Sequence, residues 1–277
     1  MASRENKNRI KISAVILAKN EEKKITECLR SVSWVDEIIL VDGGSVDATC
    51  SLARRFKAKI FEFKKESFAE RRNFGTKKAQ GEWVLHIDSD ERITEGLREE
   101  ILEEMSSNSF SHYAIPRSNF VFGKKMKHCG LWPDYVVRLF KKKDFVTWQG
   151  DLHETPVIKG KLGYMNNYFI HIKHDNLFDI VEKTNKWSLI EAKLMFDACH
   201  PPMNLLRFAS SIFREFYLRM IKQLAFLDGV EGVIYGIYQV WSRFLSYAKL
   251  WEMQENNSKL KTQKSKINND LFGLKLF

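Results

Sequence analysis

The chain has 277 residues, of which 44% are hydrophobic and 29% charged, so it can bury a sizeable core and does not have the composition of a disordered protein. Its four cysteines, Cys28, Cys50, Cys129 and Cys199, form no CxxC pair, which argues against a disulfide framework and a zinc site of the usual spacing. The formal net charge of +10 predicts attraction to anionic partners, whether nucleic acid, acidic lipid or phosphorylated substrate.

Signals for secretion or membrane spanning are not found. Residues 1–10 are polar and lack the apolar centre of a signal peptide. No stretch reaches about 18 consecutive apolar residues, so we expect no membrane-spanning helix. Scattered cysteines also fit a reducing compartment. These features together predict a cytoplasmic protein.

Residues 12–105 alternate between two patterns. Apolar, β-branched runs predict strands over 12–18, 37–42, 58–63 and 82–87. Apolar residues at helical spacing predict helices over 19–32, 46–56, 67–81 and 94–105. This alternation predicts an α/β fold with a mostly parallel central sheet and helices on both faces.

Polar groups follow three of the expected strands, at residues 19–21, 42–44 and 88–90. In parallel sheets, ligands bind beyond the carboxyl ends of the strands. Because these three segments should meet at one edge of the sheet, we expect the functional site there.

The third of these segments carries two aspartates. Side chains two apart in a strand point the same way, so Asp88 and Asp90 should present two carboxylates together. Carboxylate oxygens suit Mg²⁺ or Mn²⁺, which complete their shells with water and substrate phosphates. The alternative is a solvated acidic loop in which Glu91 caps the next helix.

The second half of the chain divides into three segments. The less regular pattern over residues 106–176 predicts shorter strands of mixed direction. Helical spacing of apolar residues within 177–254 predicts helices over 177–199, 204–227 and 230–253. Residues 255–277 are rich in Lys, Asn and Ser, and we expect a flexible basic tail.

Three segments together carry a resemblance: "AVILAKNEE" (14–22), "EIILVDGGSVDAT" (37–49) and "AERRNFGTKKAQGEWVLHIDSDE" (69–91). They resemble the nucleotide-sugar-dependent glycosyltransferases of family 2, which have the GT-A fold. Shorter segments, "WPDYVVRLFKK", "LHE" and "FLDGVEG", resemble the branch that builds bacterial lipopolysaccharide core and related surface glycans. The resemblance implies a nucleotide-sugar-binding half over 1–105, an acceptor-binding half over 106–176 and a C-terminal helical extension.

The resemblance also implies which residues bind the nucleoside. Ala18, Asn20 and Glu21 would contact it, with Glu21 near the ribose, and Asp42 would hydrogen-bond the pyrimidine edge. Alternatively, Glu21 serves only the helix dipole and Asp42 only caps a turn. The sequence departs from the commonest family pattern at Gly43, where an acid often stands.

Further roles implied by the resemblance concern the diphosphate and the metal. Arg72 would lie near the nucleotide, Asp88 near ribose and metal, and Asp90 would be the principal metal ligand. Arg138 could meet the diphosphate through its planar guanidinium. The alternative for Arg71 and Arg72 is a solvated helix face.

Transfer to a hydroxyl needs a carboxylate to accept its proton. Among Asp134, Asp144, Asp151 and Glu154, we expect Glu154 to be the general base, with Asp151 second, because a His-Glu pair recurs at this place in the resembling branch. The alternative for Glu154 is a surface loop acid.

Histidines and tryptophans of the second half are further candidates. His153 could orient the base. His171 and His174 could offer a further metal ligand or be structural. Trp132 and Trp148 could stack on an acceptor sugar or belong to the core.

The helix expected over 204–227 is basic and amphipathic. An apolar stripe is formed by Leu205, Phe208, Ile212, Phe216, Met220 and Leu224, and other faces carry Arg207, Arg214, Arg219 and Lys222. Such a helix can lie in an anionic membrane surface. Alternatively, the stripe packs on the catalytic domain or forms a homo-oligomer interface.

The leading hypothesis is therefore an inverting glycosyltransferase that is peripheral on the inner face of the cell membrane. It would use a nucleoside diphosphate sugar, expected to be uridine-linked, with Mg²⁺ or Mn²⁺. The acceptor would be a lipid-linked or lipopolysaccharide-core glycan. A second enzyme hypothesis is transfer to a polyprenyl phosphate. The hypothesis from another class is a basic, non-catalytic module that binds nucleic acid or glycan, but no nucleic-acid-binding motif is found, so we expect no nucleic-acid partner.

Overall fold

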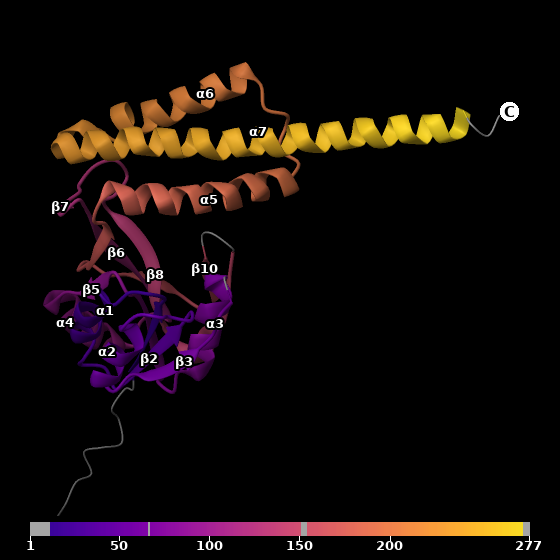
Figure 1. Ribbon diagram of the computed structural model, residues 1–277. Coiled ribbons are helices and arrows are strands. Elements are labelled where there is room, and N and C mark those ends of the chain that lie inside the picture. Colours follow the sequence, from indigo (N-terminus) through magenta and orange to yellow (C-terminus); the bar gives the residue numbers. More distant parts are fainter. Residues whose placement is uncertain (1–11, 66, 151–153, 274–277) are drawn as a thin grey trace, which may run out of the picture. The chain divides into compact units, whose positions relative to one another are not determined.

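A computed structural model describes residues 12–65, 67–150 and 154–273 (Figure 1). The chain divides into two compact units, of which the first ends at Lys173 and the second begins at His174. Each unit has its own architecture, one built on a sheet and the other on helices.

Within the described residues, the first unit contains a ten-stranded sheet in the order β3-β2-β1-β4-β8-β6-β12-β5, with β7 and β11 also paired to β6. Its strands are β1 (Ile12–Ala18), β2 (Glu37–Asp42), β3 (Lys59–Glu62), β4 (Trp83–Asp88), β5 (Glu91–Ile93), β6 (His112–Val121), β7 (Lys124–Lys125), β8 (Asp134–Lys141), β11 (Leu162–Tyr164) and β12 (Phe169–His174). The first four strands in this order are parallel, and β8 pairs antiparallel with both β4 and β6. A separate hairpin joins β9 (Phe145–Gln149) to β10 (Thr155–Ile158).

Helices cover both faces of the parallel strands. One face packs on α1 (Ile25–Ser31), α2 (Thr49–Arg55) and α4 (Glu95–Ser107), and the other on α3 (Phe68–Lys78) and β9. Alternate residues of β1 enter the two cores, as expected for a strand buried on both sides. The predicted α/β class is therefore confirmed.

The close approach of α3 to the sheet depends on Gly75. A Cβ atom at this position would lie 2.4 Å from Cγ1 of Val15 and 3.0 Å from Cγ2 of Val41, so a larger residue would push α3 away from β1 and β2. The helix begins where the Ser67 hydroxyl accepts a hydrogen bond from the backbone N–H of Glu70. This packing fixes the height of the α3 side chains above the strand ends.

The strand register brings the predicted polar segments to one edge, which we call the carboxyl edge. Ala18 of β1 pairs with Asp42 of β2, and Leu17 pairs with Asp88 of β4. The ends of β1, β2 and β4 therefore meet side by side, as the sequence predicts for a ligand site.

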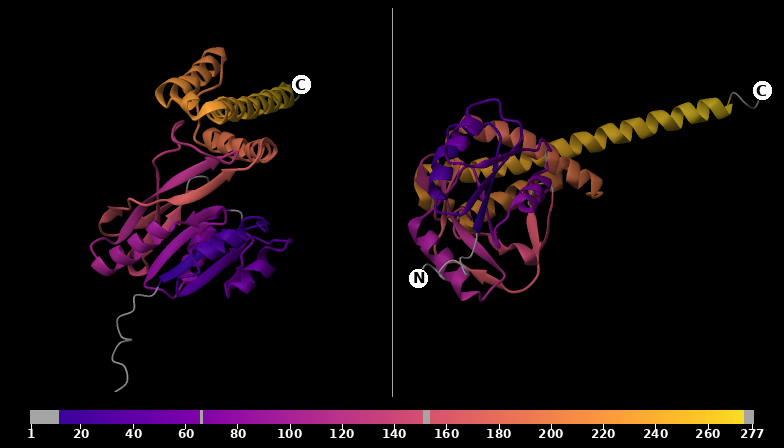
Figure 2. Two further views of the ribbon diagram at one scale, coloured as in Figure 1. Left: turned by 90° about the vertical axis from the view of Figure 1, so that its left-hand side faces the viewer. Right: turned by 90° about the horizontal axis from the view of Figure 1, so that it is seen from below.

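The second unit is helical. It contains α5 (Leu177–Asp197), α6 (Leu205–Phe216), a π-helical segment η2 (Tyr217–Lys222), a 3₁₀ turn η3 (Ala225–Asp228) and α7 (Gly229–Gly273). Helix α7 lies between α5 and α6, and its C-terminal half extends past both (Figures 1 and 2). None of the helices in the described part of the chain has the length and apolar content to cross a membrane.

Two features of this unit differ from the sequence expectation. The single helix expected over 204–227 is α6, a π-helical segment and a 3₁₀ turn, with a left-handed residue, Leu224, before the turn. Helix α7 continues through most of the segment expected as a flexible tail. That segment has no proline and no glycine before residue 273, so nothing in its backbone ends the helix earlier.

Candidate functional site

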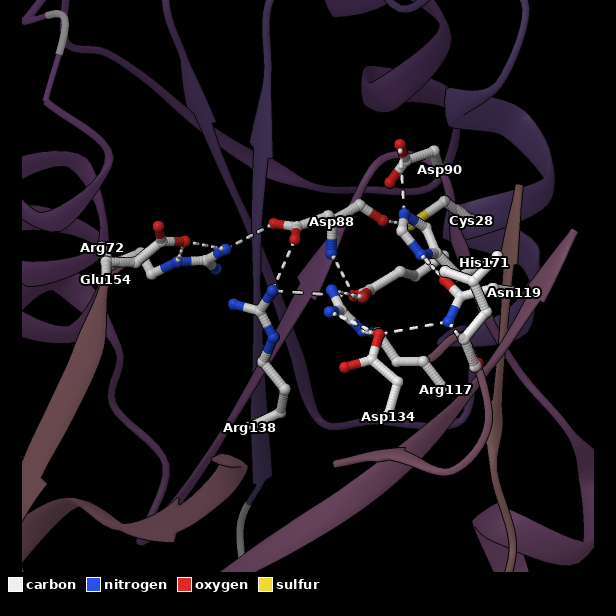
Figure 3. Close-up of polar contacts among 12 residues, drawn as sticks. Cys28, Arg72, Asp88, Asp90, Arg117, Asn119, Asp134, Arg138, Glu154 and His171 are labelled. Carbon is white, nitrogen blue, oxygen red and sulfur yellow. Dashed lines mark hydrogen bonds and ion pairs between the residues drawn. The ribbon is translucent and has the colours of Figure 1, made fainter. Parts of the chain in front are cut away.

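Asp88, at the end of β4, is held between two buried arginines (Figure 3). Its Oδ1 atom accepts a hydrogen bond from Arg72 at 2.7 Å, and its Oδ2 atom accepts one from Arg138 at 2.6 Å. Burial alone would raise the pKa of Asp88, but Arg138 and Arg72 outweigh it and hold the pKa well below its ordinary value. Asp88 is therefore ionised and neutralised by α3 on one side and β8 on the other.

Arg72 also reaches Glu154, the predicted base. Its guanidinium lies 2.8 Å from Oε1 of Glu154 and 5.1 Å from the ring centre of Trp148, and only 1% of Arg72 is exposed. The alternative of a solvated helix face is therefore wrong for Arg72. One arginine thus joins two carboxylates from distant segments, which places Glu154 beside Asp88.

Asp90 faces a different partner, His171 of β12. Its Oδ2 atom lies 3.6 Å from Nε2 of His171. The other ring nitrogen, Nδ1, lies 2.6 Å from Oδ1 of Asn119. The Asn119 amide nitrogen donates to Leu131 and Asp134, so its oxygen must accept, and Nδ1 of His171 carries the proton.

This tautomer leaves the Nε2 lone pair of a neutral His171 pointing toward the Asp90 carboxylate. A separation of 3.6 Å is too long for a hydrogen bond. It suits two ligands of one divalent ion, which lie roughly 3 to 4 Å apart when each is about 2.1 Å from the metal. The pair therefore fits a divalent cation, and the hydrogen bond to Asn119 holds the His171 ring in its orientation.

The remaining acids at this edge do not complete a larger ligand set. No group of three His, Cys, Asp or Glu side chains among the described residues is arranged to hold a metal. Burial alone would raise the pKa of Asp90, but the charge of a protonated His171 outweighs it and lowers the pKa, and a bound cation would act in the same direction. The side chain offers an ionised carboxylate for a cation that takes its other ligands from phosphate and water.

Glu91 is not part of a solvated acidic loop, as one alternative held. It is fully buried, and its Oε2 atom accepts a hydrogen bond from the backbone N–H of Asp88 at 2.9 Å. Its other carboxylate oxygen lies 3.7 Å from Arg117 and 4.0 Å from Arg138. Glu91 thus holds the backbone of the Asp-x-Asp segment in place.

Asp42 and the loop after β1 form the other half of the edge. Asp42 is 4% exposed and accepts hydrogen bonds from the backbone N–H groups of Gly44 and Ser45. Asn20 is in the left-handed conformation, its side-chain oxygen accepts a hydrogen bond from the backbone N–H of Val46, and its own backbone N–H donates to the Ser45 hydroxyl. The two loops are thereby tied together, and the nucleoside contacts implied for Asn20 and Asp42 stay predictions.

Ala18 and Glu21 lie in the same pair of loops. Ala18 is buried at the end of β1, and the backbone N–H of Glu21 donates to the Thr49 hydroxyl at 2.8 Å. The structure therefore gathers the four residues implied for the nucleoside, Ala18, Asn20, Glu21 and Asp42, at the ends of β1 and β2.

Gly43 makes room for Arg71, which is buried and therefore not part of a solvated helix face. The Arg71 guanidinium donates to the carbonyl oxygens of Ala18 at 2.8 Å and Val41 at 3.2 Å. A Cβ atom at Gly43 would lie 2.9 Å from Nη2 of Arg71. Burial lowers the pKa of Arg71, and Asp42 opposes that shift. In the resembling family an acid often stands at the position of Gly43. In this chain the guanidinium of Arg71 lies against that glycine instead, and no local sequence pattern indicates this contact.

Other candidates lie in different surroundings. Asp151 and His153 fall outside the described residues. Trp148 is 3% exposed and packs in the core beneath Arg72, so it is not a stacking platform. Trp132 is 37% exposed and lies against Tyr168.

Comparisons with known proteins bear on this site. The family described as "Glycosyl transferase family 2" matches residues 13–160, more than half of the chain. An uncharacterized glycosyltransferase of Rickettsia typhi is 26% identical over 88% of this chain and 87% of its own length. The lipopolysaccharide core biosynthesis glycosyltransferase LpsC of Rhizobium meliloti is 24% identical over 88% of this chain and 93% of its own length.

Solved structures show weaker likeness. TarS of Staphylococcus aureus in complex with UDP-GlcNAc is 13% identical with a TM-score of 0.45, covering 90% of this chain and 92% of that chain. Glucosyl-3-phosphoglycerate synthase of Mycobacterium tuberculosis, solved with Mn²⁺ and UDP, is 23% identical with a TM-score of 0.34, covering 40% of this chain and 44% of that chain.

Proposed function

Because the chain belongs to glycosyltransferase family 2, we propose that it moves a sugar from a UDP-linked donor to a hydroxyl of a lipid-linked or lipopolysaccharide-core glycan, with inversion at the anomeric carbon and with Mg²⁺ or Mn²⁺ bound. The likeness to LpsC along most of both chains supports the choice of acceptor class. The gathering of Ala18, Asn20, Glu21 and Asp42 at one edge supports the donor site.

The observation that carries the proposal is the Asp90–His171 pair at the carboxyl edge, 3.6 Å apart with the tautomer of His171 fixed by Asn119. Asp90 and His171 would hold the ion. When bound, a divalent ion neutralises the diphosphate and stabilises it as a leaving group. Asp88 has a separate task, because each of its oxygens already accepts a hydrogen bond from an arginine.

Arg138 and Arg72 supply fixed positive charge beside the diphosphate position. Both are almost fully buried, so their charge acts in a medium of low dielectric constant. Asp88 and Glu91 balance that charge and fix the direction of the guanidinium groups. The residues are therefore oriented before any substrate arrives, which is the arrangement that favours transition-state stabilisation.

Glu154 is the base that this geometry supports best. Its carboxylate is held by Arg72 next to Asp88, and its side chain keeps 14% of its surface exposed. An ionised carboxylate at this place can accept the proton of an attacking hydroxyl. Direct attack of that hydroxyl on the anomeric carbon, with the nucleoside diphosphate leaving, gives inversion.

A thermal-shift titration tests the donor site. UDP with Mn²⁺ at about 100 times Kd should stabilise the protein by about 2.7 kcal/mol and raise Tm by roughly 5 to 10 °C. Asp90→Ala and His171→Ala should lose the part of the shift that depends on Mn²⁺, because each removes a ligand. Glu103→Gln, which alters an exposed acid of α4, is the matched control and should keep the full shift. Equal shifts in all four proteins would refute the metal assignment.

A further inference from the structure

The α6 helix buries two polar residues and leaves several large apolar ones exposed. Ser211 and Glu215 are each 6% exposed, whereas Leu206 is 80% exposed and Phe213 is 71% exposed. Helices of water-soluble bundles bury the apolar stripe and expose the polar one. Phe208 and Ile212 are half-buried, and Phe208 packs against Phe244, so α6 buries only part of its apolar surface in this unit.

Ion pairs within the second unit account for the buried polar side. Glu215 pairs with Arg219 at 2.7 Å and lies 3.9 Å from Arg243 of α7. Arg243 also pairs with Glu191 of α5, which accepts a hydrogen bond from the Ser246 hydroxyl at 2.6 Å. Polar contacts of this kind also join helices that are surrounded by lipid chains, where burying apolar side chains gives little driving force.

The exposed apolar side chains of this segment make up a surface that we call the α6 face. It comprises Leu205, Leu206, Phe213, Phe216, Tyr217, Ile221, Leu224, Phe226, Leu227 and Val230, each between 38% and 83% exposed. It runs from the start of α6 through η2 and η3 to the start of α7. Apolar patches of this extent mark surfaces that are covered by another molecule.

The charge around the α6 face selects the occupant. Between residues 203 and 230, the exposed charged side chains are Arg207, Arg214 and Lys222. The acids of this stretch, Glu215 and Asp228, are buried. A second copy of the chain would bring the same cations against one another, whereas acidic lipid headgroups would neutralise them.

We propose that the α6 face lies in the interfacial layer of a bilayer that contains anionic lipid. Its apolar side chains would enter the boundary between headgroups and acyl chains, and Arg207, Arg214 and Lys222 would meet the phosphates. In this arrangement the protein binds one surface of the bilayer. The proposal stands on the second unit alone, and it would bring the enzyme to an acceptor carried on lipid.

Co-sedimentation with vesicles tests the proposal on the full-length protein. Vesicles of phosphatidylglycerol and phosphatidylethanolamine should bind the protein, and high salt should release it. Vesicles of phosphatidylcholine alone should bind at least tenfold less. Arg214→Gln with Lys222→Gln should lower partitioning about 30-fold, from about 1 kcal/mol for each cation.

A second variant separates apolar insertion from charge. Phe213→Ser with Ile221→Ser should lower partitioning at least tenfold, whereas Leu102→Ser, an exposed leucine of α4, should leave it unchanged. Circular dichroism and the UDP–Mn²⁺ thermal shift should be the same in all variants, which distinguishes lost membrane binding from lost folding or lost donor binding.

Three results would overturn the proposal. The first is no binding to any vesicle. The second is equal binding to neutral and anionic vesicles at all salt concentrations. The third is a dimer in sedimentation velocity that Phe213→Ser with Ile221→Ser dissociates without any change in vesicle binding, which would assign the α6 face to a second copy of the chain.

Discussion

Asp88 and Asp90 are two residues apart, yet they have different partners. Asp88 accepts hydrogen bonds from Arg72 and Arg138, whereas Asp90 faces His171. The two carboxylates therefore do not share one cation equally. Asp88 thus orients the two arginines, whereas the carboxylate of Asp90 can bind a metal.

Glu154→Gln gives a prediction at the residue scale. The amide oxygen of glutamine can still accept from Arg72, so the fold and the UDP–Mn²⁺ thermal shift should be unchanged. Release of UDP from a UDP-sugar with rough lipopolysaccharide as acceptor should fall by about 10²- to 10⁴-fold, because an amide cannot accept the proton. Glu103→Gln is the control. Undiminished turnover in the Glu154→Gln variant would show that another group is the base.

The sequence could predict the acids of the site but not their partners. Asp42, Asp88 and Asp90 follow apolar runs and are visible in the pattern. Arg71 and Arg72 read equally well as a solvated helix face, because their burial depends on α3 packing at the height set by Gly75. His171 reaches Asp90 only through the long-range pairing of β12 with β5, which no local signal gives.

At the element scale, the alternation of strands and helices up to residue 105 was predictable because each parallel strand is a continuous apolar run. The antiparallel strands after residue 106 were predictable only as short strands. Their order places β8 beside β4 and brings Arg138 to Asp88, which depends on contacts about 50 residues apart. The change from α6 to a π-helical segment could not be predicted either, because that segment contains no proline or glycine.

Glu37, at the start of β2, gives a prediction at the element scale. Its carboxylate accepts hydrogen bonds from the Ser13 hydroxyl of β1 at 2.6 Å, from Lys59 of β3 at 2.7 Å and from the backbone N–H of Gln80 at 2.8 Å. Burial alone would raise its pKa, but these bonds outweigh burial and lower the pKa. Because the folded-state pKa is lowered, the stabilisation is complete above the unfolded-state pKa and is lost as the pH falls through the folded-state value.

Glu37→Gln should therefore lower the free energy of unfolding by about 2 kcal/mol near pH 7. The difference from the wild type should shrink as the pH falls below about 4, where Glu37 becomes protonated in both states. Urea unfolding at several pH values measures this, with Glu103→Gln as control. A difference that stays constant from pH 7 down to about pH 3 would show that the ionised carboxylate is not what stabilises the strands.

At the scale of the whole molecule, a sheet-based unit carries the candidate site and a helical unit carries the α6 face. Apolar periodicity predicted the stripe on α6 but could not tell which side faces its neighbours, because a stripe looks the same whether it meets a core or a lipid surface. Of the residues in the predicted stripe, Leu205, Phe216 and Leu224 are exposed. The net charge of +10 likewise predicted anionic partners in general. The positions of the cations on α6 are what relate this charge to one surface.

Pulsed electron paramagnetic resonance of Mn²⁺ bound with UDP tests the central claim most directly, because it detects nitrogen nuclei coordinated to the ion. We predict a coupled nitrogen in the wild type and in the control His112→Ala, and its loss in His171→Ala. Bound Mn²⁺ without a coupled nitrogen, or a nitrogen signal that persists in His171→Ala, would contradict the assignment of Asp90 and His171 as the metal-binding pair.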